Sequence, residues 1–102
     1  MNKSGVIILS NNWVFNDLPN TMVLTTKDVL IMKKPILFVS HDEDDSMWQF
    51  HCGEDVDMDN ATLVSLKEIV DYDTSVTILN DLPLGWIAWR ETESSPWTRQ
   101  KN

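Results

Sequence analysis

Residues 35–52 read PILFVSHDEDDSMWQFHC, and this stretch decides the fold. Its first part, 36–39, is a continuous apolar run with a β-branched residue at each end, which is typical of a strand buried on both faces. After a polar turn, Trp48, Phe50 and Cys52 alternate with polar residues, the period of a half-buried strand. The pattern predicts a hairpin in which 36–39 is the central strand, Trp48 and Phe50 face the core, and the acidic turn lies at one edge of the sheet.

Shorter elements are expected on the N-terminal side of this hairpin. Residues 5–9 and 13–15 are rich in β-branched and aromatic residues, and a Ser-Asn-Asn turn separates them, so they predict a second hairpin. Thr25 or Thr26 is a suitable helix cap, and two lysines precede the next proline. These features predict a helix over 27–33 that ends before the proline.

Side-chain caps predict two helical segments on the C-terminal side. Ser65 and Glu68 match a capping box, in which the serine accepts a hydrogen bond from an unpaired backbone N–H, so a helix is expected from Leu66. Asp73 or Thr74 is expected to cap a second short helical turn. Both segments place apolar residues at helical spacing and are therefore expected to pack on the sheet.

The remaining C-terminal residues predict a strand and a tail. Residues 86–89, Trp-Ile-Ala-Trp, are expected to form the last strand, and the polar residues 98–102 are expected to be a frayed tail. Residues 1–97 would then be one domain, because a chain of 102 residues has room for one core. We expect an α+β fold, mainly an antiparallel sheet with two or three short helices packed on it.

Acidic residues are concentrated in the middle of this chain, whose net charge is −8. No Lys or Arg occurs between Lys34 and Lys67, which predicts one strongly negative end of the molecule. Such a field repels nucleic acid and anionic membranes and attracts a basic protein. The alternative is that the acids only keep the protein soluble. The candidate partner-binding residues are Asp42, Glu43, Asp44, Asp45, Glu54, Asp55, Asp57 and Asp59.

The same acids resemble a calcium-binding loop only in part. Asp55, Asp57 and Asp59 have the alternating spacing of such a loop. However, Asn60 stands where an EF-hand needs glycine, and Leu66 stands where it needs a bidentate glutamate. We therefore expect no metal site, and no motif indicates a cofactor.

His41, His51 and Cys52 are the candidate residues for an alternative function, a small enzyme or ligand-binding domain. Neighbours on a strand point to opposite faces, so His51 is poorly placed to activate Cys52. One cysteine with two histidines makes no recognisable zinc pattern, and no phosphate-binding or nucleophile motif is present. We expect no catalytic residues and no enzyme activity.

Residues 39–50 (VSHDEDDSMWQF), 64–70 (VSLKEIV) and 82–97 (LPLGWIAWRE to SPW) carry a resemblance. Here the chain resembles a family of small bacterial proteins of uncharacterised function, and more distantly an immunity-protein-like family of polymorphic toxin systems. The resemblance implies a compact, cytoplasmic α+β domain and supplies no catalytic residues. The elements shared with the distant family are Asp45, Trp48 and Phe50, the acidic loop Glu54–Asp59, and Ser65, Leu66 and Ile69.

We therefore expect a non-enzymatic, cytoplasmic protein-binding domain, immunity-like, that presents an acidic edge to a basic protein such as a toxin domain. No nucleic acid partner is expected, because the negative field repels the phosphate backbone. No membrane partner is expected, because the same field repels anionic membranes and no run approaches the roughly 20 apolar residues of a membrane span. Two alternatives stay open: the enzyme or ligand-binding domain described above, and an accessory domain that associates with itself through its sheet edge. The oligomeric state is open.

Overall fold

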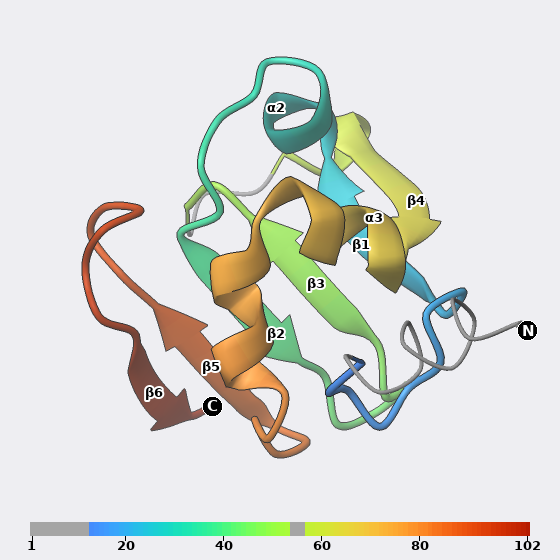
Figure 1. The fold of residues 1–102 in the computed structure, drawn as a ribbon, viewed down its shortest axis with the longest axis vertical. Coiled ribbons are helices and arrows are strands. Elements are labelled where there is room, and N and C mark those ends of the chain that lie inside the picture. Colours follow the sequence, from blue (N-terminus) through green and yellow to red (C-terminus); the bar gives the residue numbers. More distant parts are fainter. Residues whose placement is uncertain (1–12, 54–56) are drawn as a thin grey trace, which may run out of the picture.

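The computed structural model describes residues 13–53 and 57–102. These residues form an α+β domain with one six-stranded sheet of order β4-β1-β3-β2-β5-β6 (Figure 1). The strands are β1 (Met22–Thr26), β2 (Phe38–His41), β3 (Trp48–His51), β4 (Ala61–Ser65), β5 (Trp86–Trp89) and β6 (Thr98–Lys101). The helical segments are α2 (Lys27–Leu30), α3 (Leu66–Tyr72) and the 3₁₀ helices η1 (Met58–Asn60) and η2 (Thr74–Leu79). None of these helices is long and apolar enough to cross a bilayer.

The predicted hairpin lies at the centre of the sheet. β2 and β3 pair antiparallel, with Val39 opposite Phe50 and His41 opposite Trp48. β3 also pairs with β1 in parallel, and β2 also pairs with β5, so both hairpin strands are interior. Val39, Trp48 and Phe50 are at most 2% exposed, which confirms the predicted core-facing side. The first strand begins at Phe38 and not at residue 36, although Ile36 is itself buried.

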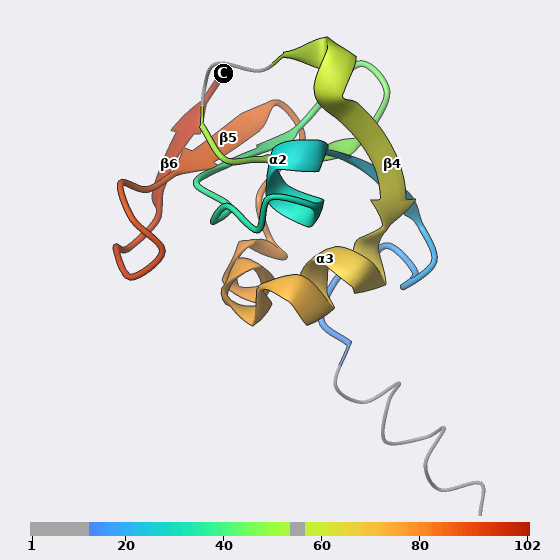
Figure 2. The ribbon, with the colours of Figure 1, turned by 90° about the horizontal axis from the view of Figure 1, so that it is seen from above.

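The two faces of the sheet differ in what covers them. Helices α2, α3 and η2 lie on one side, and the opposite side is free of them (Figure 2). The core lies between this helical layer and the covered face, because alternating strand residues point to the same side. It includes Val23, Val39, Phe50, Val64 and Ala88 from the strands and Val29, Leu66, Ile69, Val76 and Leu79 from the helices.

The helix starts at Leu66 and Thr74 follow the predicted caps. The Ser65 hydroxyl accepts a hydrogen bond from the Glu68 N–H at 3.1 Å, and α3 begins at Leu66 as expected. The Asp73 carboxylate accepts from the Ser75 N–H at 3.0 Å and caps η2. In both cases a short polar side chain satisfies a backbone donor that the first helical turn leaves unpaired.

The helix predicted over 27–33 is wrong in length. α2 ends at Leu30, and Lys33 adopts a φ of 61°. A left-handed residue ends a helix because its backbone directs the chain out of the helical path. Thr26 occupies the cap position but makes no side-chain cap hydrogen bond.

The strand predicted over 13–15 is also wrong, and its predicted partner, 5–9, lies outside the described residues. Residues 13–17 form a loop that packs on Trp48. The Trp48 indole N–H donates to the Asp17 carboxylate at 2.9 Å, and the rings of Phe15 and Trp48 make an edge contact at 5.4 Å. The aromatic side chains of this segment therefore pack against the core although the segment is a loop and not a strand.

Strands β1 and β4 were not predicted, although they pair along their full length, from Met22 with Ser65 to Thr26 with Ala61. Their alternation is hidden in the sequence, because apolar residues occur on both faces. Leu24 and Leu63 lie on the face without helices, while the polar Thr25 is fully buried and donates to the Phe50 carbonyl at 2.7 Å.

The prediction of a frayed tail over 98–102 is wrong. Residues Thr98–Lys101 form β6, which pairs with all of β5, from Trp89 with Thr98 to Trp86 with Lys101. β5 is therefore not the last strand. All four residues of β6 are exposed, so this edge strand is held by backbone pairing with β5 and by the Arg99 guanidinium, which donates to the Asp81 carboxylate at 2.7 Å and to the Ile78 carbonyl at 2.8 Å.

A buried arginine connects this C-terminal part to the core. Arg90 is 5% exposed, and its guanidinium donates to the Ile36 carbonyl at 3.0 Å, to the Ser75 hydroxyl at 2.9 Å and to the Asp73 carboxylate at 2.8 Å. The guanidinium also lies 4.1 Å from the ring centroid of Trp97, directly before β6. Arg90 thus links the entry to β2, the start of η2 and the start of β6.

The substitution Arg90→Ala is expected to lower the free energy of unfolding by about 3–5 kcal/mol, because it leaves the Asp73 carboxylate largely buried without its partner. Urea titration followed by circular dichroism measures this change. The control Lys67→Ala removes the exposed pair with Asp71, whose side chains are 57% and 63% exposed. It should cost less than about 1 kcal/mol. Equal losses would contradict a central role for Arg90.

Candidate functional site

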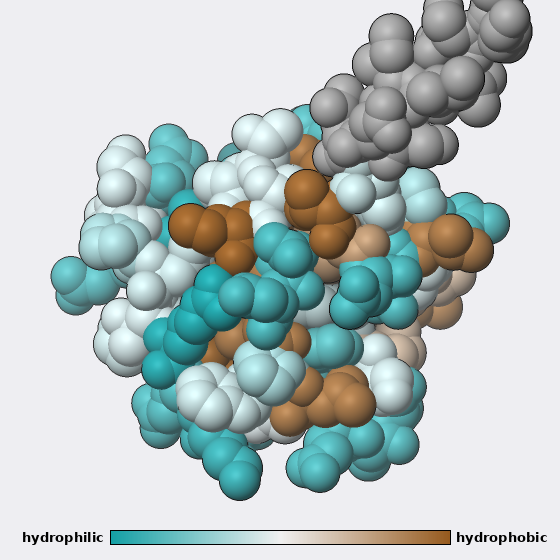
Figure 3. Space-filling model, turned by 60° about the horizontal axis from the view of Figure 1, so that its bottom comes forward, coloured by the Kyte–Doolittle hydropathy of each residue, from teal (hydrophilic) through white to brown (hydrophobic). Residues whose placement is uncertain are grey.

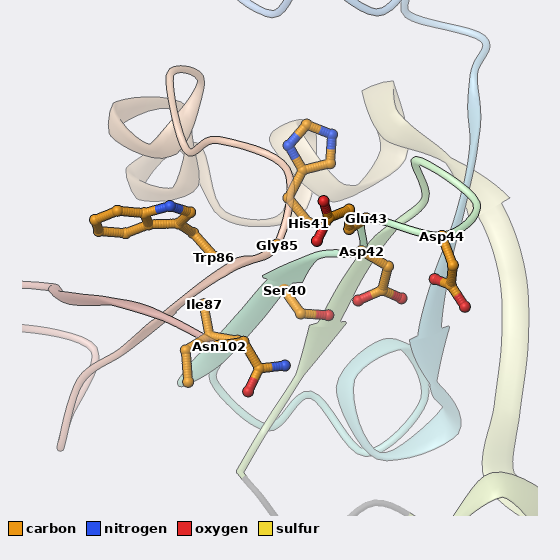
Figure 4. Close-up of a pocket in the computed structure, with 9 residues that line it drawn as sticks. All are labelled: Ser40, His41, Asp42, Glu43, Asp44, Gly85, Trp86, Ile87 and Asn102. Atoms are coloured by element: carbon orange, nitrogen blue, oxygen red, sulfur yellow. The ribbon is translucent and has the colours of Figure 1, made fainter.

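A shallow hollow of about 260 Å³ lies beside the end of β2, next to the acidic turn (Figure 4). The side chains of Ser40, Asp42 and Asn102 point to one side of the sheet, whereas His41 and Trp86 point to the other. The hollow is therefore at the margin of the face that carries no helices. Its lining residues are Ser40, His41, Asp42, Glu43, Asp44, Gly85, Trp86, Ile87 and Asn102.

Two carboxylates of the acidic turn stabilise the turn itself. One oxygen of Asp45 accepts from the Met47 N–H at 3.0 Å, and the Asp42 carboxylate accepts from the side-chain amide of Gln49. Ser46 adopts a φ of 62°, a conformation that this local hydrogen bonding supports. Asp42 and Asp45 therefore have structural roles in addition to their charge.

The other two acids of the turn, Glu43 and Asp44, are exposed and accept no hydrogen bond from residues 13–53 or 57–102. Glu43 lies over Gly85, where a Cβ would come 3.2 Å from its carboxylate oxygen. Gly85 has a φ of 83°, a left-handed conformation that favours glycine. The backbone of Gly85 donates to the His41 carbonyl at 2.7 Å and accepts from the Asn102 N–H at 2.8 Å.

Ser40 adds a neutral polar group to the hollow. The residue is only 8% exposed, and its hydroxyl makes no hydrogen bond with any described residue. No lysine or arginine is among the described residues that line the hollow. The combination of carboxylates, a hydroxyl and a carboxamide suits an ammonium or guanidinium group.

Viewed from the end that holds the turn, the surface is mainly hydrophilic, and hydrophobic side chains occur in separate spots (Figure 3). Several cations elsewhere are already paired with acids, including Arg90 with Asp73 and Arg99 with Asp81 at 2.7 Å. Glu43 and Asp44 form no salt bridge with any described residue, so their negative charges are not neutralised.

The predicted acidic residues do not form one edge. Asp42–Asp45 precede β3, whereas Asp57 and Asp59 follow it, so the two groups lie at opposite ends of the strand (Figure 1). Asp57 accepts from the Asp59 N–H at 3.0 Å and caps η1. Glu54 and Asp55 lie outside the described residues. The prediction of a single negative end is wrong, because the length of β3 separates the two acidic groups, although they are close together in the sequence.

The candidate catalytic residues are not brought together. His41 stacks on Trp48 with 3.9 Å between ring centroids, and its Nδ1 lies 2.7 Å from a main-chain carbonyl. His51 points to the opposite face, and Cys52 is partly buried against the core. Histidine and cysteine therefore do not form a nucleophile and base. Within the described residues, no three His, Cys, Asp or Glu side chains are grouped to hold a metal ion.

His51 is buried, which corrects the prediction of a half-buried strand. It is 2% exposed, and its Nε2 lies 2.8 Å from the Gln49 side-chain oxygen. Because that oxygen accepts, Nε2 carries the proton, and the buried Nδ1 has no partner among the described residues. Burial lowers the pKa of His51 below its ordinary value of 6.5, against the opposing effect of the Asp42 carboxylate. A hydrogen-bonded chain thus runs from His51 through Gln49 to the acidic turn.

Comparisons of the chain with protein-family models, with curated proteins and with solved structures found no significant match. The similarity to an immunity-protein-like family therefore stays a prediction from the sequence. The geometry of the site carries the functional argument.

Acid should destabilise the protein through His51. Its pKa is lower in the folded than in the unfolded chain, so the unfolded chain binds more protons between the two values. This contribution to stability is fully present above pH 6.5 and is lost as the pH falls through the folded pKa. His51→Gln should remove this part of the pH dependence. Urea titrations at about pH 7.5 and about pH 5.5 measure it, and an unchanged dependence in the variant would contradict the assignment.

Calcium titration should reveal no tight site, because the glycine and glutamate that a calcium loop requires around Asp57 and Asp59 are missing. Isothermal calorimetry of the purified protein is the measurement. A dissociation constant at or below about 1 μM, in the range of sensor loops, would show that the acids form a specific site.

Proposed function

We propose that this protein is a non-enzymatic binding domain that recognises a basic protein through the acidic turn and the adjacent hollow. The observation that supports the proposal is the position of Glu43 and Asp44. Both are exposed, unpaired within the described chain, and next to a hollow that no cation lines. Exposed carboxylates without a hydrogen-bond or ion-pair partner can bind a cation of another protein. Carboxylates that already stabilise a turn or an ion pair are less available for binding.

The hollow suggests how one cationic side chain of the partner would be held. Its ammonium or guanidinium group would approach the exposed carboxylates of Glu43 and Asp44 and donate to the Ser40 hydroxyl and the Asn102 carboxamide oxygen. The remaining negative charge would accelerate encounter with a basic surface. This attraction acts over about 10 Å at 0.1 M salt, so it depends on ionic strength.

In cellular terms, we propose a bacterial, cytoplasmic, immunity-like protein whose partner is a basic toxin domain. The sequence resemblance and the acidic surface support this role. Nucleic acid and anionic membranes are unfavourable partners for the same electrostatic reason.

The double variant Glu43→Gln/Asp44→Asn tests the acidic turn. Its affinity for a labelled decalysine peptide at low salt should fall about fivefold, the effect of two exposed charge pairs of roughly 0.5 kcal/mol each. Fluorescence anisotropy measures the affinity. The matched control Glu91→Gln/Glu93→Gln changes the net charge equally on another loop and should have little effect. Equal losses would mean that only the net charge matters.

Stability measurements separate binding from turn structure. Neither Glu43 nor Asp44 makes a described hydrogen bond, so the double variant should unfold at nearly the wild-type urea concentration. Asp45→Ala removes the acceptor of the Met47 N–H and should lower the free energy of unfolding by about 1 kcal/mol. If the double variant were the less stable protein, the charges of the turn would serve the fold and not a partner.

A further inference from the structure

The face of the sheet opposite α2, α3 and η2, called the open face below, carries apolar side chains that do not belong to the core. The strand register places Leu24 next to Leu63, and Phe38 next to Trp89, on this face. Met22 and Leu63 are 51% and 54% exposed, and the others are only partly buried. The apolar residues of the open face are Met22, Leu24, Phe38, Leu63, Ile87 and Trp89.

Acidic loops border the open face at both ends of β3. The β2–β3 turn and the η1 segment both curve to the side of the sheet away from α3 (Figure 2). Glu43 and Asp44 therefore border one end of the open face, and Asp59 borders the other. The hollow beside the turn is continuous with the face, since Ser40 and Ile87 contribute to both.

Trp89 has the properties of an anchor on this surface. It lies on β5 between Phe38 of β2 and Thr98 of β6 and is partly exposed. Its indole N–H has no described hydrogen-bond acceptor and is not among the buried unpaired donors of the described residues, so it faces solvent. A partner would thus find an aromatic surface together with an unused donor, a combination that recurs at the energetic centres of interfaces.

We propose that the open face is the docking surface for the basic protein partner. This inference rests on the proposed function and extends it from one cationic side chain to a whole surface. The partner's apolar side chains would cover the apolar residues of the open face, and its lysines or arginines would meet the acidic loops at both ends. The apolar residues form two groups, one on β1 and β4 and one on β2 and β5, and the polar Gln49 and His51 of β3 lie between them. Protein interfaces combine apolar patches of this kind with a polar rim.

Charge selects a basic partner over other occupants of this face. A second copy of the chain carries the same net charge of −8 and the same acidic rim, so pairing of two open faces would bring like charges together. An anionic bilayer is repelled for the same reason. A positively charged protein surface is attracted to the acidic rim and is not repelled in either of these ways.

Two charge-matched peptides test the docking surface, one alternating Lys and Leu and the other alternating Lys and Gly. Anisotropy titrations should give about tenfold tighter binding of the Lys-Leu peptide, because only this peptide buries apolar area on the open face. The double variant Met22→Ser/Leu63→Ser should reduce this preference by at least half. The control Ile31→Ser/Ile78→Ser changes side chains that are 67% and 62% exposed elsewhere and should leave the preference unchanged. Circular dichroism confirms that both variants fold.

The outcomes distinguish this inference from the proposed function. Equal affinities for the two peptides, or equal effects of the two variants, would overturn the docking surface. If binding in that case still fell in Glu43→Gln/Asp44→Asn, the function of the acidic turn would stand. A preference for the Lys-Leu peptide that ignored the acidic turn would support the open face and overturn the role of the turn. Absence of binding by both peptides at low salt would overturn both.

Discussion

The buried guanidinium of Arg90 is the interaction on which the arrangement of this small domain depends. Its donors join the carbonyl before β2, the capping residue of η2 and the hydroxyl of Ser75, and Trp97 covers its flat surface. A buried charge is tolerated only where its hydrogen bonds and its counter-charge are supplied together. Asp73 supplies both the counter-charge and a hydrogen bond, because one of its carboxylate oxygens accepts from Arg90. Its other carboxylate oxygen caps η2. Segments that are far apart in the sequence are therefore positioned jointly.

The Arg90 interaction also positions one wall of the candidate site. Trp97 lies on Arg90 and directs the chain into β6, and β6 leads to Asn102, whose N–H donates to Gly85 at 2.8 Å. Gly85 in turn lies beneath Glu43 and binds the backbone of His41. One wall of the acidic hollow is thus made of the end of the chain, and the other is made of the central hairpin. The acidic residues all come from the turn of the hairpin, but the hollow beside them is formed by the hairpin and the C-terminal residues together.

Helices α2, α3 and η2 all cover the same face of the sheet, and the proposed function uses the other face. Packing of α2, α3 and η2 uses the apolar side chains of one strand face, and the apolar residues of the open face remain outside the core. The acidic loops border that open face, and in the proposed function their charge would oppose its association with another copy of this chain or with an anionic membrane. In the proposed function, the apolar area of this surface would favour contact while its charge would restrict which partners can approach.

Local sequence patterns determined the parts of this protein whose signals lie within a few residues. The alternation around Trp48 and Phe50 predicted the hairpin, and Ser65 and Asp73 predicted the starts of α3 and η2, because strand faces and helix caps depend on near neighbours. Tertiary structure alone decided the rest. β1 and β4 are apolar on both faces, and β6 is polar throughout, so each is recognisable only by the strand it pairs with. The acids that are close in sequence lie at opposite ends of β3, and His51 is buried by neighbours from other strands, because distances across a sheet follow from strand order and not from sequence separation.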